Sequence, residues 1–441
     1  MTDPTFADAL FARAEDVVQS CTGCGKCYEV CPMPGPAGLG GETPVSITAA
    51  VRDLVAGGPG SAAAERWASV CSGSGHCIPV CPEGVNPRFM LTLARLAVVK
   101  AKPELVRRKA GAEAFRTMSK AVRVLSRIQL APEVLSRFDE VDEAGTTDPV
   151  EVVFYTGCNL RRTPHIALLC FELLDRLGVT WRVEGGPQSC CGVIQTRNGD
   201  VAMAGNVAYR TTDRFAAARP KTVLAWCPTC HVQIGENVLP GRRMQQPDAF
   251  SFGMQPFIVW LADRLDQLRP MMTHRVEKRV ALHEHPGVAG VTEATIRILR
   301  AIPGLDFVDL EQPSVGYMCN TLQPLPAFKR DLHRHLLEAA AEAKVDALAG
   351  VYHVCHRELC AHERDWPFEV INVMDLIGAA MGFAAEDVFK RLKTLQDADA
   401  VLADVAGLAQ AYGLKLDDVR EVVAKELLGE QPLELASPGR S

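Results

Sequence analysis

The sequence lacks three features that would place it in other classes of protein. Its net charge is only −6, so it has no strong basic footprint of the kind that nucleic-acid binders show. Its most apolar window, residues 370–383, is interrupted by Asn372 and Asp375 and is too short to span a bilayer. The first residues contain neither a basic segment nor a continuous apolar run, so we expect no signal peptide. We expect a cytoplasmic protein that binds no nucleic acid, does not span a membrane, and reaches the cytoplasmic face of one only through a partner.

Motifs for organic redox cofactors are missing as well. No G-x-G-x-x-G follows a strand pattern and no P-loop is present. The stretch AGGPGSA follows a helical pattern and is typical of a loop. We therefore expect no nicotinamide or flavin site in this chain, so that a partner must supply or accept hydride or thiol electrons.

Cysteine, in contrast, is plentiful. The chain has 16 cysteines, and three tight motifs contain most of them. A reducing compartment excludes a disulfide framework of this size. Such spacing is instead typical of metal, cluster or thiol chemistry.

Two short cysteine runs near the N-terminus are almost copies of each other. Residues 21–32, CTGCGKCYEVCP, have the spacing C-x2-C-x2-C-x3-C-P, and residues 71–82, CSGSGHCIPVCP, repeat it with a serine in the second position. In two-cluster ferredoxin-like proteins, closely spaced cysteines hold one iron–sulfur cluster and the cysteine before proline ligates the other. Structural zinc, the alternative, favours two C-x2-C pairs without a trailing C-P. The predicted ligands are Cys21, Cys24, Cys27 and Cys81 for cluster 1, a cubane [4Fe-4S], and Cys71, Cys77 and Cys31 for cluster 2.

Ser74 leaves the second set one thiolate short. A serine hydroxyl is a hard oxygen donor that replaces a thiolate poorly. Three arrangements remain open: Ser74 ligates as an alkoxide, cluster 2 is a [3Fe-4S] cluster, or another group such as solvent completes a [4Fe-4S] cluster. Loss of the cluster is the fourth alternative, but the other three cysteines and both prolines remain. We expect a populated site with Ser74 in the fourth position.

Five further cysteines form a different motif. Their spacing is C-x31-CC-x35-C-x2-C, and Gly192 follows the adjacent pair. Together with the runs before it, this motif resembles the CCG-domain proteins, which include heterodisulfide reductase catalytic subunits and the iron–sulfur subunits of glycolate oxidase and anaerobic glycerol-3-phosphate dehydrogenase. The resemblance extends from residue 20 to about residue 385 and implies a non-cubane [4Fe-4S] cluster. The ligands that it implies are Cys158, Cys190, Cys191, Cys227 and Cys230.

The strand patterns support one common site for this motif. Cys158 follows the strand-like run VEVVFYTG, and Cys227 follows TVLAW. Because α/β sheets bind ligands outside the carboxyl ends of their strands, both thiols are expected at one edge of a sheet. Cys170 lies in the middle of the helical pattern ALLCFELL and is expected to be a core thiol.

The second half of the chain repeats the strand–helix order with an altered motif. Carried over by spacing, the five positions become Pro286, Met318, Cys319, Cys355 and Glu358. This set cannot hold a five-thiolate cluster. Near it lie five of the chain's 11 histidines, namely His283, His285, His353, His356 and His362. Zinc or an atypical cluster is one interpretation, and histidines that are surface or satisfied core residues are an equally weighted one. The candidate ligands are Cys319, Cys355, Cys360, His283 and His285.

Strands alternating with helices predict α/β layers with parallel pairing. We expect a multidomain protein with a helical ferredoxin-like two-cluster domain, two α/β CCG domains and a helical C-terminal tail. An acidic and then Gly/Thr/Pro-rich stretch, residues 139–149, marks a boundary. Residues 368–381, FEVINVMDLIGAAM, are expected to be helical. The predicted divisions are 1–102 for the two-cluster domain, 103–148 for a helical connector, 149–272 for the CCG domain with the intact motif, 273–386 for the one with the degenerate motif, and 387–441 for the tail.

These patterns favour an iron–sulfur redox subunit of a heterodisulfide-reductase-like complex. Such a subunit would relay electrons between a flavoprotein or other dehydrogenase partner, the ferredoxin-like clusters and the non-cubane cluster, with a membrane or quinone-linked subunit as a further partner. A disulfide reductase acting directly on a thiol substrate is the first alternative, although the altered second motif counts against it. A redox or iron sensor, or an assembly scaffold, is the alternative from another class. Catalytic residues, substrate and electron direction do not follow from the sequence.

Overall fold

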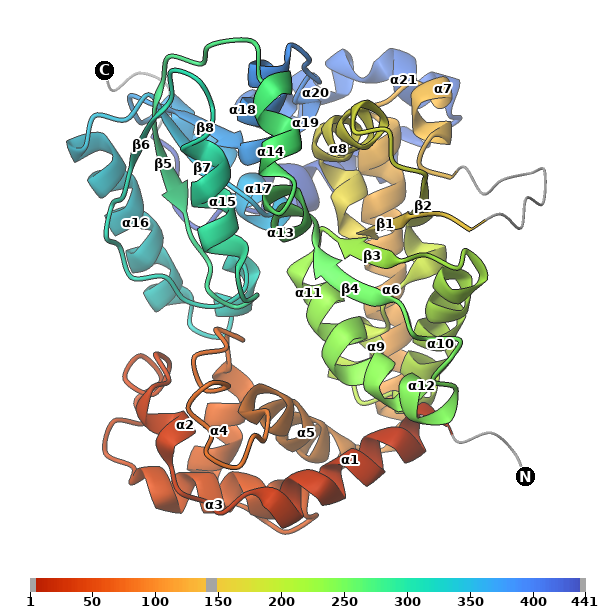
Figure 1. Cartoon of the computed structure of the whole chain (residues 1–441), viewed down its shortest axis with the longest axis vertical. Helices are drawn as coiled ribbons and strands as arrows, with labels where there is room; N and C mark the ends of the chain where they lie inside the picture. The colour runs from red at the N-terminus through yellow and green to blue at the C-terminus, as the bar shows by residue number, and fades with distance from the viewer. Residues whose placement is uncertain (1–4, 140–148, 437–441) are drawn as a thin grey trace.

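The computed structural model describes residues 5–139 and 149–436, and it contains a helical N-terminal unit and two α/β halves (Figure 1). The boundary expected at residues 139–149 falls almost entirely outside the described residues. All 16 cysteines are free in the structure. Within the described parts of the chain, no helix is both long and apolar enough to cross a membrane.

The N-terminal unit consists of five helices, and the cysteine runs lie in the loops between them and in the short helix α2, which contains Cys27. The helix α1 begins at a capping box in which Thr5 and Asp8 satisfy each other's backbone N–H groups. Cys21 ends α1 and Cys71 ends α4, so each cysteine run starts where a helix stops. The fully buried Trp67 lies in the core of this unit. The helices are α1 (Phe6–Ser20), α2 (Lys26–Glu29), α3 (Pro44–Val55), α4 (Ala62–Val70) and α5 (Pro87–Lys100).

The helical pattern predicted over residues 103–140 is confirmed by two helices, α6 (Glu104–Arg127) and α7 (Pro132–Ser136). Figure 1 shows the long α6 running behind the first α/β half, from the N-terminal unit toward the opposite end of the molecule. It packs against the helices of this half and against the C-terminal helices.

The first α/β half has a parallel four-stranded sheet in the order β2-β1-β3-β4. Its central strands are the two that the sequence predicts, and every residue of β1 is buried. The strands are β1 (Val152–Gly157), β2 (Trp181–Gly185), β3 (Thr222–Ala225) and β4 (Gly253–Pro256). The helical segments are η1 (Asn159–Arg162), α8 (Pro164–Arg176), η2 (Pro187–Ser189), α9 (Val193–Arg197), α10 (Val201–Ala217), α11 (Pro228–Val232), the π-helical η3 (Gln233–Val238), α12 (Leu239–Gln245), α13 (Phe257–Ala262), α14 (Leu265–Leu268) and η4 (Arg269–Met271).

The second α/β half repeats this topology with the strand order β6-β5-β7-β8, again parallel throughout. The helix expected over residues 368–381 is wrong in its first part, because Glu369–Asn372 forms strand β8 and the helix begins only at Val373. Asn372 caps that helix through a capping box with Asp375. The elements are β5 (Arg279–His283), α15 (Val291–Leu299), β6 (Asp306–Val308), η5 (Cys319–Leu322), α16 (Pro326–Glu342), β7 (Ala347–Gly350), α17 (His353–Leu359), η6 (Cys360–Arg364), β8 (Glu369–Asn372) and α18 (Val373–Met381).

The C-terminal residues are helical, as expected, and they dock onto both α/β halves. Glu430 lies between Arg162 of the first half and Arg357 of the second, at 3.2 and 2.7 Å. The fully buried Lys393 donates to the backbone carbonyls of Arg357 and Glu430. These contacts fix the position of the helices α19 (Val388–Thr394), α20 (Ala398–Asp404), α21 (Ala406–Ala411), α22 (Leu416–Val422) and the π-helical η7 (Val423–Leu428).

Candidate functional site

The five cysteines of the CCG motif lie together at the carboxyl edge of the first sheet. One directly follows β1, two follow β2 through η2, and two belong to the turn from β3 into α11. This is the edge at which parallel sheets bind ligands. All five side chains are buried, with exposed fractions of 8% or less. They are Cys158, Cys190, Cys191, Cys227 and Cys230. Cys170 is in the apolar core, as expected.

The thiols of this group interact directly. The pKa of Cys191 is lowered well below its usual range by hydrogen bonds from the Cys190 and Cys230 thiols, and that of Cys227 is lowered by Cys230. Burial raises the pKa of Cys158 to about 12. Five thiols cannot all ionise in so little solvent unless a cation offsets their charge. The soft sulfur donors therefore suit a thiolate-bound metal cluster.

Backbone geometry leaves space around these sulfur atoms. Gly157 has a φ of +61°, and a Cβ placed on it would lie 2.8 Å from the Cys230 sulfur. Gly192, at φ +79°, donates its N–H to the Cys190 sulfur at 3.4 Å. The Asn159 side chain donates to the Cys158 sulfur at 3.5 Å. N–H groups directed at sulfur are the kind of contact that tunes thiolate-bound clusters.

The N-terminal cysteines also gather, in part as predicted. Cys31 lies close enough to Cys71 and Cys77 for their charges to interact, and Cys21 and Cys24 act in the same way on Cys27. Burial raises the pKa of Cys77 to about 12. The proximity of Cys31 to Cys71 and Cys77 matches the crossed set expected for cluster 2, whereas for cluster 1 it is Cys21, Cys24 and Cys27 that lie together. The half-buried Cys81 packs against the same apolar core.

Ser74 is buried and bonded to the second α/β half. Its hydroxyl accepts a hydrogen bond from the backbone N–H of Gly316 at 2.7 Å and lies 3.0 Å from the Ser72 hydroxyl. A Cβ on Gly73 would lie 2.3 Å from the ring of Tyr317. The loop that carries the second cysteine run is therefore closely packed against a segment far along the chain.

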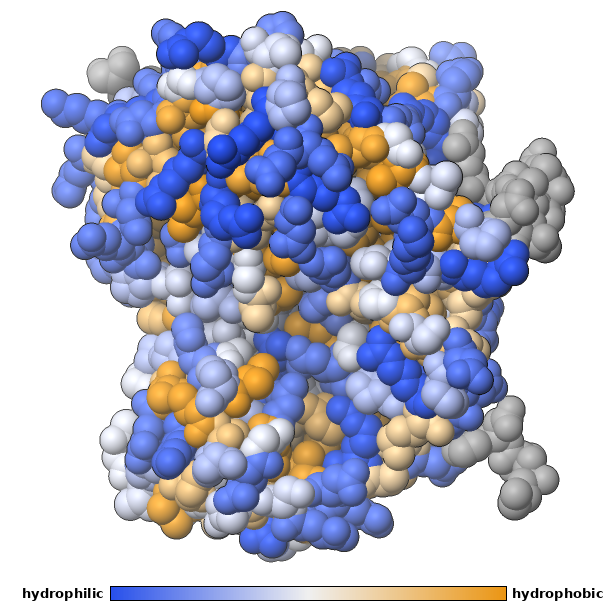
Figure 2. All heavy atoms as spheres, in the orientation of Figure 1, coloured by the Kyte–Doolittle hydropathy of each residue, from blue (hydrophilic) through white to orange (hydrophobic). Residues whose placement is uncertain are grey.

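Arg88 joins all three parts of the molecule. Its guanidinium donates to the carbonyl of Gly73 at 2.9 Å and to the carbonyl of Gly287 in the second half. It also forms an ion pair with Glu236 of the π-helical η3 in the first half. Figure 2 shows the surface hollowed between the N-terminal helices and the two α/β halves above them. A cavity at this junction is lined by both Arg88 and Cys71.

The strand ends of the two halves pair Cys355 with a different cysteine of the first half than the residue spacing does. The central strands β3 and β7 end at Ala225 and Gly350. Cys355 lies as far beyond Gly350 as Cys230 lies beyond Ala225, and each is the third residue of its helix, α17 or α11. The structural counterpart of Cys355 is therefore Cys230, whereas the spacing matches it to Cys227.

The other positions carried over by spacing supply no further thiolate, although a carboxylate oxygen of Glu358 lies within 4.8 Å of the Cys319 sulfur and a ring nitrogen of His333. Glu358 is held by a buried ion pair with Lys329 at 2.7 Å. Met318 is buried among the apolar residues of the core. Cys360, predicted as a candidate ligand, is fully buried in a different apolar cluster, and burial raises its pKa to about 12.

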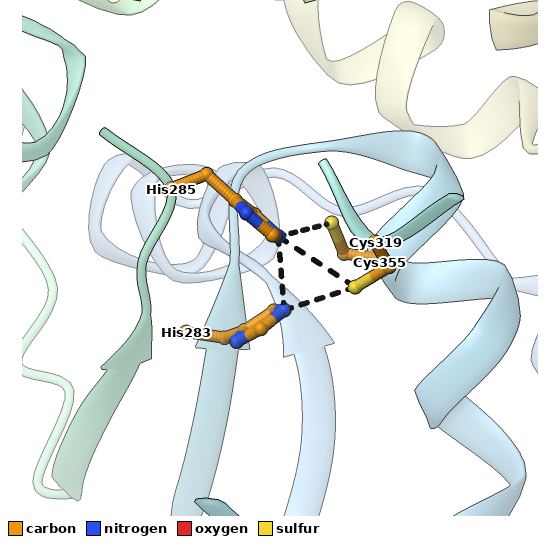
Figure 3. Close-up of side chains that lie close together, drawn as sticks. All are labelled: His283, His285, Cys319 and Cys355. Atoms are coloured by element: carbon orange, nitrogen blue, oxygen red, sulfur yellow. Dashed lines mark hydrogen bonds between the residues drawn. The ribbon is translucent and has the colours of Figure 1, made fainter. Parts of the chain in front are cut away.

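Four of the predicted ligands meet at the carboxyl edge of the second sheet (Figure 3). They are His283, His285, Cys319 and Cys355, and their ligand atoms all lie within 4.8 Å of one another. His283 Nε2 is 3.1 Å from the Cys319 sulfur, and His285 Nε2 is 3.1 Å from the Cys355 sulfur. His333, which no sequence motif singled out, also approaches this group, and its Nε2 lies 3.3 Å from the Cys319 sulfur. Its position on one face of the helical pattern of residues 326–342 was the available signal.

The remaining histidines lie outside this group. His356 Nε2 is 2.6 Å from a carboxylate oxygen of Asp387, and the Nδ1 of His165 is 3.3 Å from the other oxygen. Burial lowers the pKa of His362 to about 4, although the nearby charge of Asp365 acts to raise it. His353 is fully buried and lies next to Cys227 of the first half.

The comparison with protein families matches the part of the chain that contains the five buried cysteines. The profile of the CCG family, a cysteine-rich domain, matches residues 152–235, from the first residue of β1 to η3. This segment is similar to the CCG domain. The predicted resemblance to CCG-domain proteins is thus confirmed.

Curated relatives extend the similarity beyond the CCG domain. One subunit of the fumarate reductase (CoM/CoB) of Methanothermobacter marburgensis is 24% identical over 326 residues, which are 70% of this chain and 61% of that protein. One subunit of the dihydromethanophenazine:CoB–CoM heterodisulfide reductase is 21% identical in both Methanosarcina acetivorans and Methanosarcina mazei, over 84% and 83% of this chain and 95% and 94% of theirs. This chain therefore spans less than two thirds of its fumarate reductase relative. No solved structure matches.

Both types of relative are named as subunits of oxidoreductases, which bears out the predicted class of oxidoreductase subunit. The CCG domain and the heterodisulfide reductase relatives also imply iron–sulfur clusters, and their membership of multisubunit enzymes is consistent with partner subunits.

Proposed function

We propose that this chain is an iron–sulfur redox subunit of a heterodisulfide-reductase-like complex. The observation that carries the proposal is the burial of five interacting thiols at the carboxyl edge of one parallel sheet. A purely structural role would not require five crowded thiols, because apolar side chains fill a core without the cost of burying polar groups. The similarity to the heterodisulfide reductase relatives, which covers most of both chains, supports the same class of complex.

The five thiols fit a non-cubane [4Fe-4S] cluster. When bound, such a cluster takes up and releases single electrons. The surrounding residues hold the sulfur atoms in place and exclude water, because the thiols are almost fully buried. Gly157 leaves room beside the Cys230 sulfur, and the N–H groups of Gly192 and Asn159 stabilise negative charge on two of the ligands. The proposed ligands are Cys158, Cys190, Cys191, Cys227 and Cys230.

We further propose that the N-terminal unit is a ferredoxin-like domain with two clusters. The mutual contacts of Cys31, Cys71 and Cys77 support the crossed ligand sets, and Trp67 donates its indole N–H to the Cys31 sulfur at 3.4 Å. Ser74 occupies the fourth position of cluster 2. The ligand sets remain Cys21, Cys24, Cys27 and Cys81 for a cubane [4Fe-4S] cluster, and Cys31, Cys71 and Cys77 with Ser74 for a [3Fe-4S] or [4Fe-4S] cluster.

The domain divisions proposed for this organisation follow the secondary structure. The two-cluster domain ends after α5, and the connector contains α6 and α7. The two CCG domains are separated near residue 272, before β5, and the tail begins after α18. Since the sequence has no dinucleotide or P-loop motif, a flavoprotein or other dehydrogenase is proposed as the electron partner, at the cytoplasmic face of a membrane or in the cytoplasm.

The test is a comparison of two cysteine variants in the full chain, prepared without oxygen. Cys191→Ala removes a thiol of the CCG group, whereas Cys170→Ala removes a buried core thiol of the same domain. We expect Cys191→Ala to lose about four iron atoms per chain and an EPR signal, and Cys170→Ala to keep both. Equal iron contents in the two variants would contradict the proposal.

A second measurement tests the redox role itself. The protein is reduced by dithionite and then mixed with an oxidised flavoprotein or a small disulfide, and the EPR signals are followed with time. Reoxidation by the flavoprotein supports an electron-transfer subunit, and reoxidation by the disulfide supports direct reduction. If neither reagent reoxidises the protein, the redox proposal fails and a sensor or scaffold is favoured.

A further inference from the structure

The second α/β half contains a compact group of ligand atoms that the CCG domain does not include. We propose that His283, His285, Cys319 and Cys355 bind a single zinc ion. The four side chains come from the end of β5 and the loop after it, from η5 and from α17, and they converge at the carboxyl edge of the sheet (Figure 3). Two imidazoles with two thiolates are a set that zinc binds tetrahedrally.

The separations of the atoms fit one metal ion. Zinc lies about 2.0–2.3 Å from nitrogen and sulfur ligands, so neighbouring ligands of a tetrahedral site are roughly 3.3–3.8 Å apart. Here Nε2 of His285 lies 3.1 Å from the Cys355 sulfur and 3.6 Å from the Cys319 sulfur. The two imidazole Nε2 atoms are 3.1 Å apart. An ion at the centre requires only small outward shifts of these side chains.

The same distances disfavour iron–sulfur clusters at this place. A four-iron cluster needs about four thiolates, and this group supplies two. A Rieske-type [2Fe-2S] centre also uses two cysteines and two histidines, but its cysteines bind one iron and its histidines the other. Two iron atoms and bridging sulfides would have to separate the pairs, whereas all four ligand atoms here lie within 4.8 Å of one another.

Charge supports a divalent ion. Two thiolates and two neutral imidazoles balance the charge of Zn²⁺, so the bound site carries no net charge in a buried environment. Three of the four ligands are buried, and His283 is partly exposed. Glu358, which could add negative charge, is paired with Lys329.

Neighbouring groups orient the ligands. Nδ1 of His285 lies 2.9 Å from the carbonyl oxygen of Val315, and a proton on Nδ1 leaves Nε2 free to bind metal. His333 Nε2 lies 3.3 Å from the Cys319 sulfur, where an N–H can stabilise a thiolate. An open cavity lined by His283, His285 and His333 reaches the group and provides a path for the ion.

The alternative is a cysteine–histidine hydrogen-bond network without metal. Two variants of the full chain distinguish the alternatives: Cys355→Ala removes a ligand, and Cys360→Ala removes a buried thiol from the next helical segment outside the group. Zinc is measured by inductively coupled plasma mass spectrometry after purification without chelators. We expect about one zinc per chain in the wild type and in Cys360→Ala, and a loss of at least tenfold in Cys355→Ala. A wild type without zinc, or zinc retained in Cys355→Ala, overturns the proposal.

A spectroscopic measurement on the unmodified protein does not depend on how the variants fold. The zinc K-edge X-ray absorption should show two nitrogen neighbours at about 2.0 Å and two sulfur neighbours at about 2.3 Å. Coordination by sulfur alone or by oxygen would place the ion elsewhere and refute the site. Since the cluster proposal concerns other cysteines, Cys191→Ala should lose iron and keep zinc, so the two proposals can fail separately.

Zinc at this position would give the two halves of the molecule different roles. Zinc has no redox chemistry in proteins, so the second half would be a fixed structural platform and not a second electron site. The ligands join the end of β5 to η5 and α17. The ion would therefore hold the carboxyl edge of the second sheet in the form that contacts the N-terminal unit.

Discussion

The hydroxyl of Ser74 accepts a hydrogen bond from the backbone N–H of Gly316, and both groups are buried. The residue that breaks the cysteine pattern of the second run is therefore part of an interface between the N-terminal unit and the second α/β half. Arg88 reinforces the same interface through the carbonyls of Gly73 and Gly287. Ser74 therefore has a hydrogen-bond partner regardless of what the neighbouring cysteines bind.

Replacing Ser74 by alanine should loosen this interface. The variant leaves the buried N–H of Gly316 without its acceptor, at a cost of about 1–3 kcal/mol. We expect faster hydrogen–deuterium exchange in the peptide that contains Gly316, measured by mass spectrometry. Ser69→Ala is the control, since the exposed Ser69 hydroxyl donates to the carbonyl of Arg66 in its own helix, α4. Equal exchange in the two variants would show that the hydrogen bond contributes nothing.

Replacing Ser74 by cysteine tests the proposed cluster 2. A thiolate in this position completes the four-cysteine pattern, so the variant should bind a [4Fe-4S] cluster with an altered EPR signal and potential. Iron and sulfide are counted in the wild type and the variant after the same anaerobic reconstitution. If Ser74→Cys changes neither the iron count nor the spectrum, the second site is empty in both proteins.

Gly157→Ala should disturb the CCG site more than a comparable glycine elsewhere. Its new Cβ would lie 2.8 Å from the Cys230 sulfur, whereas a Cβ on Gly178 has no atom within 4 Å. Both glycines have positive φ, so both variants pay a similar backbone cost of about 1–2 kcal/mol. We expect Gly157→Ala to lose the iron assigned to the five cysteines and Gly178→Ala to retain it. Retention of full iron in Gly157→Ala would mean that the sulfur atoms have more room than the structure gives them.

The attachment of the C-terminal helices should weaken in acid. Burial alone would raise the pKa of Glu430, but the guanidinium groups of Arg357 and Arg162 outweigh it and lower the pKa to about 2. A lowered pKa stabilises the folded state above the unfolded value of 4.5, and this contribution disappears as the pH falls from 4.5 toward 2. At pH 7 it amounts to about 3 kcal/mol.

The variant Glu430→Gln removes this contribution. It should unfold at lower urea concentration than the wild type at pH 7, and the difference should shrink below pH 4.5. Cluster loss in acid affects both proteins alike and cancels in the difference. Glu434→Gln, at an exposed position, is the control and should match the wild type at every pH. A constant difference between pH 7 and pH 3 would rule out the ion pairs as its cause.

Much of the fold follows from the sequence, because the central strands and most helices carry strong apolar patterns. Residues 152–157 are buried throughout and were recognisable as a strand, whereas β4 is a half-exposed edge strand of four residues with no alternating pattern. Residues 369–372 are also short and continue directly into α18. Their apolar residues match a helical period, so only pairing with β7 identifies them as a strand.

The residues of the candidate sites also fall into two groups: those that sequence motifs predict and those that only the fold brings together. The cysteine motifs identify the thiols that the fold later brings together, both in the short runs near the N-terminus and in the CCG motif, whose gaps span whole helices and strands. The contact between Ser74 and Gly316 joins positions 242 residues apart, and no local pattern encodes it. His333 approaches Cys319 only because α16 packs beside η5. Spacing also misassigns Cys355, because the loops of the two halves differ in length while their strands keep the same order.

The contact of the second half with the loop of residues 71–77 has a consequence for biogenesis. Tyr317 and Gly287 cover this loop, and both are synthesised long after it. Iron and sulfide would reach these cysteines most directly while the N-terminal unit is still uncovered. Translation from the N-terminus provides this interval, because the cysteine runs emerge from the ribosome first. Donation of iron and sulfide to the finished chain would instead require the second half to detach from Arg88 and Ser74.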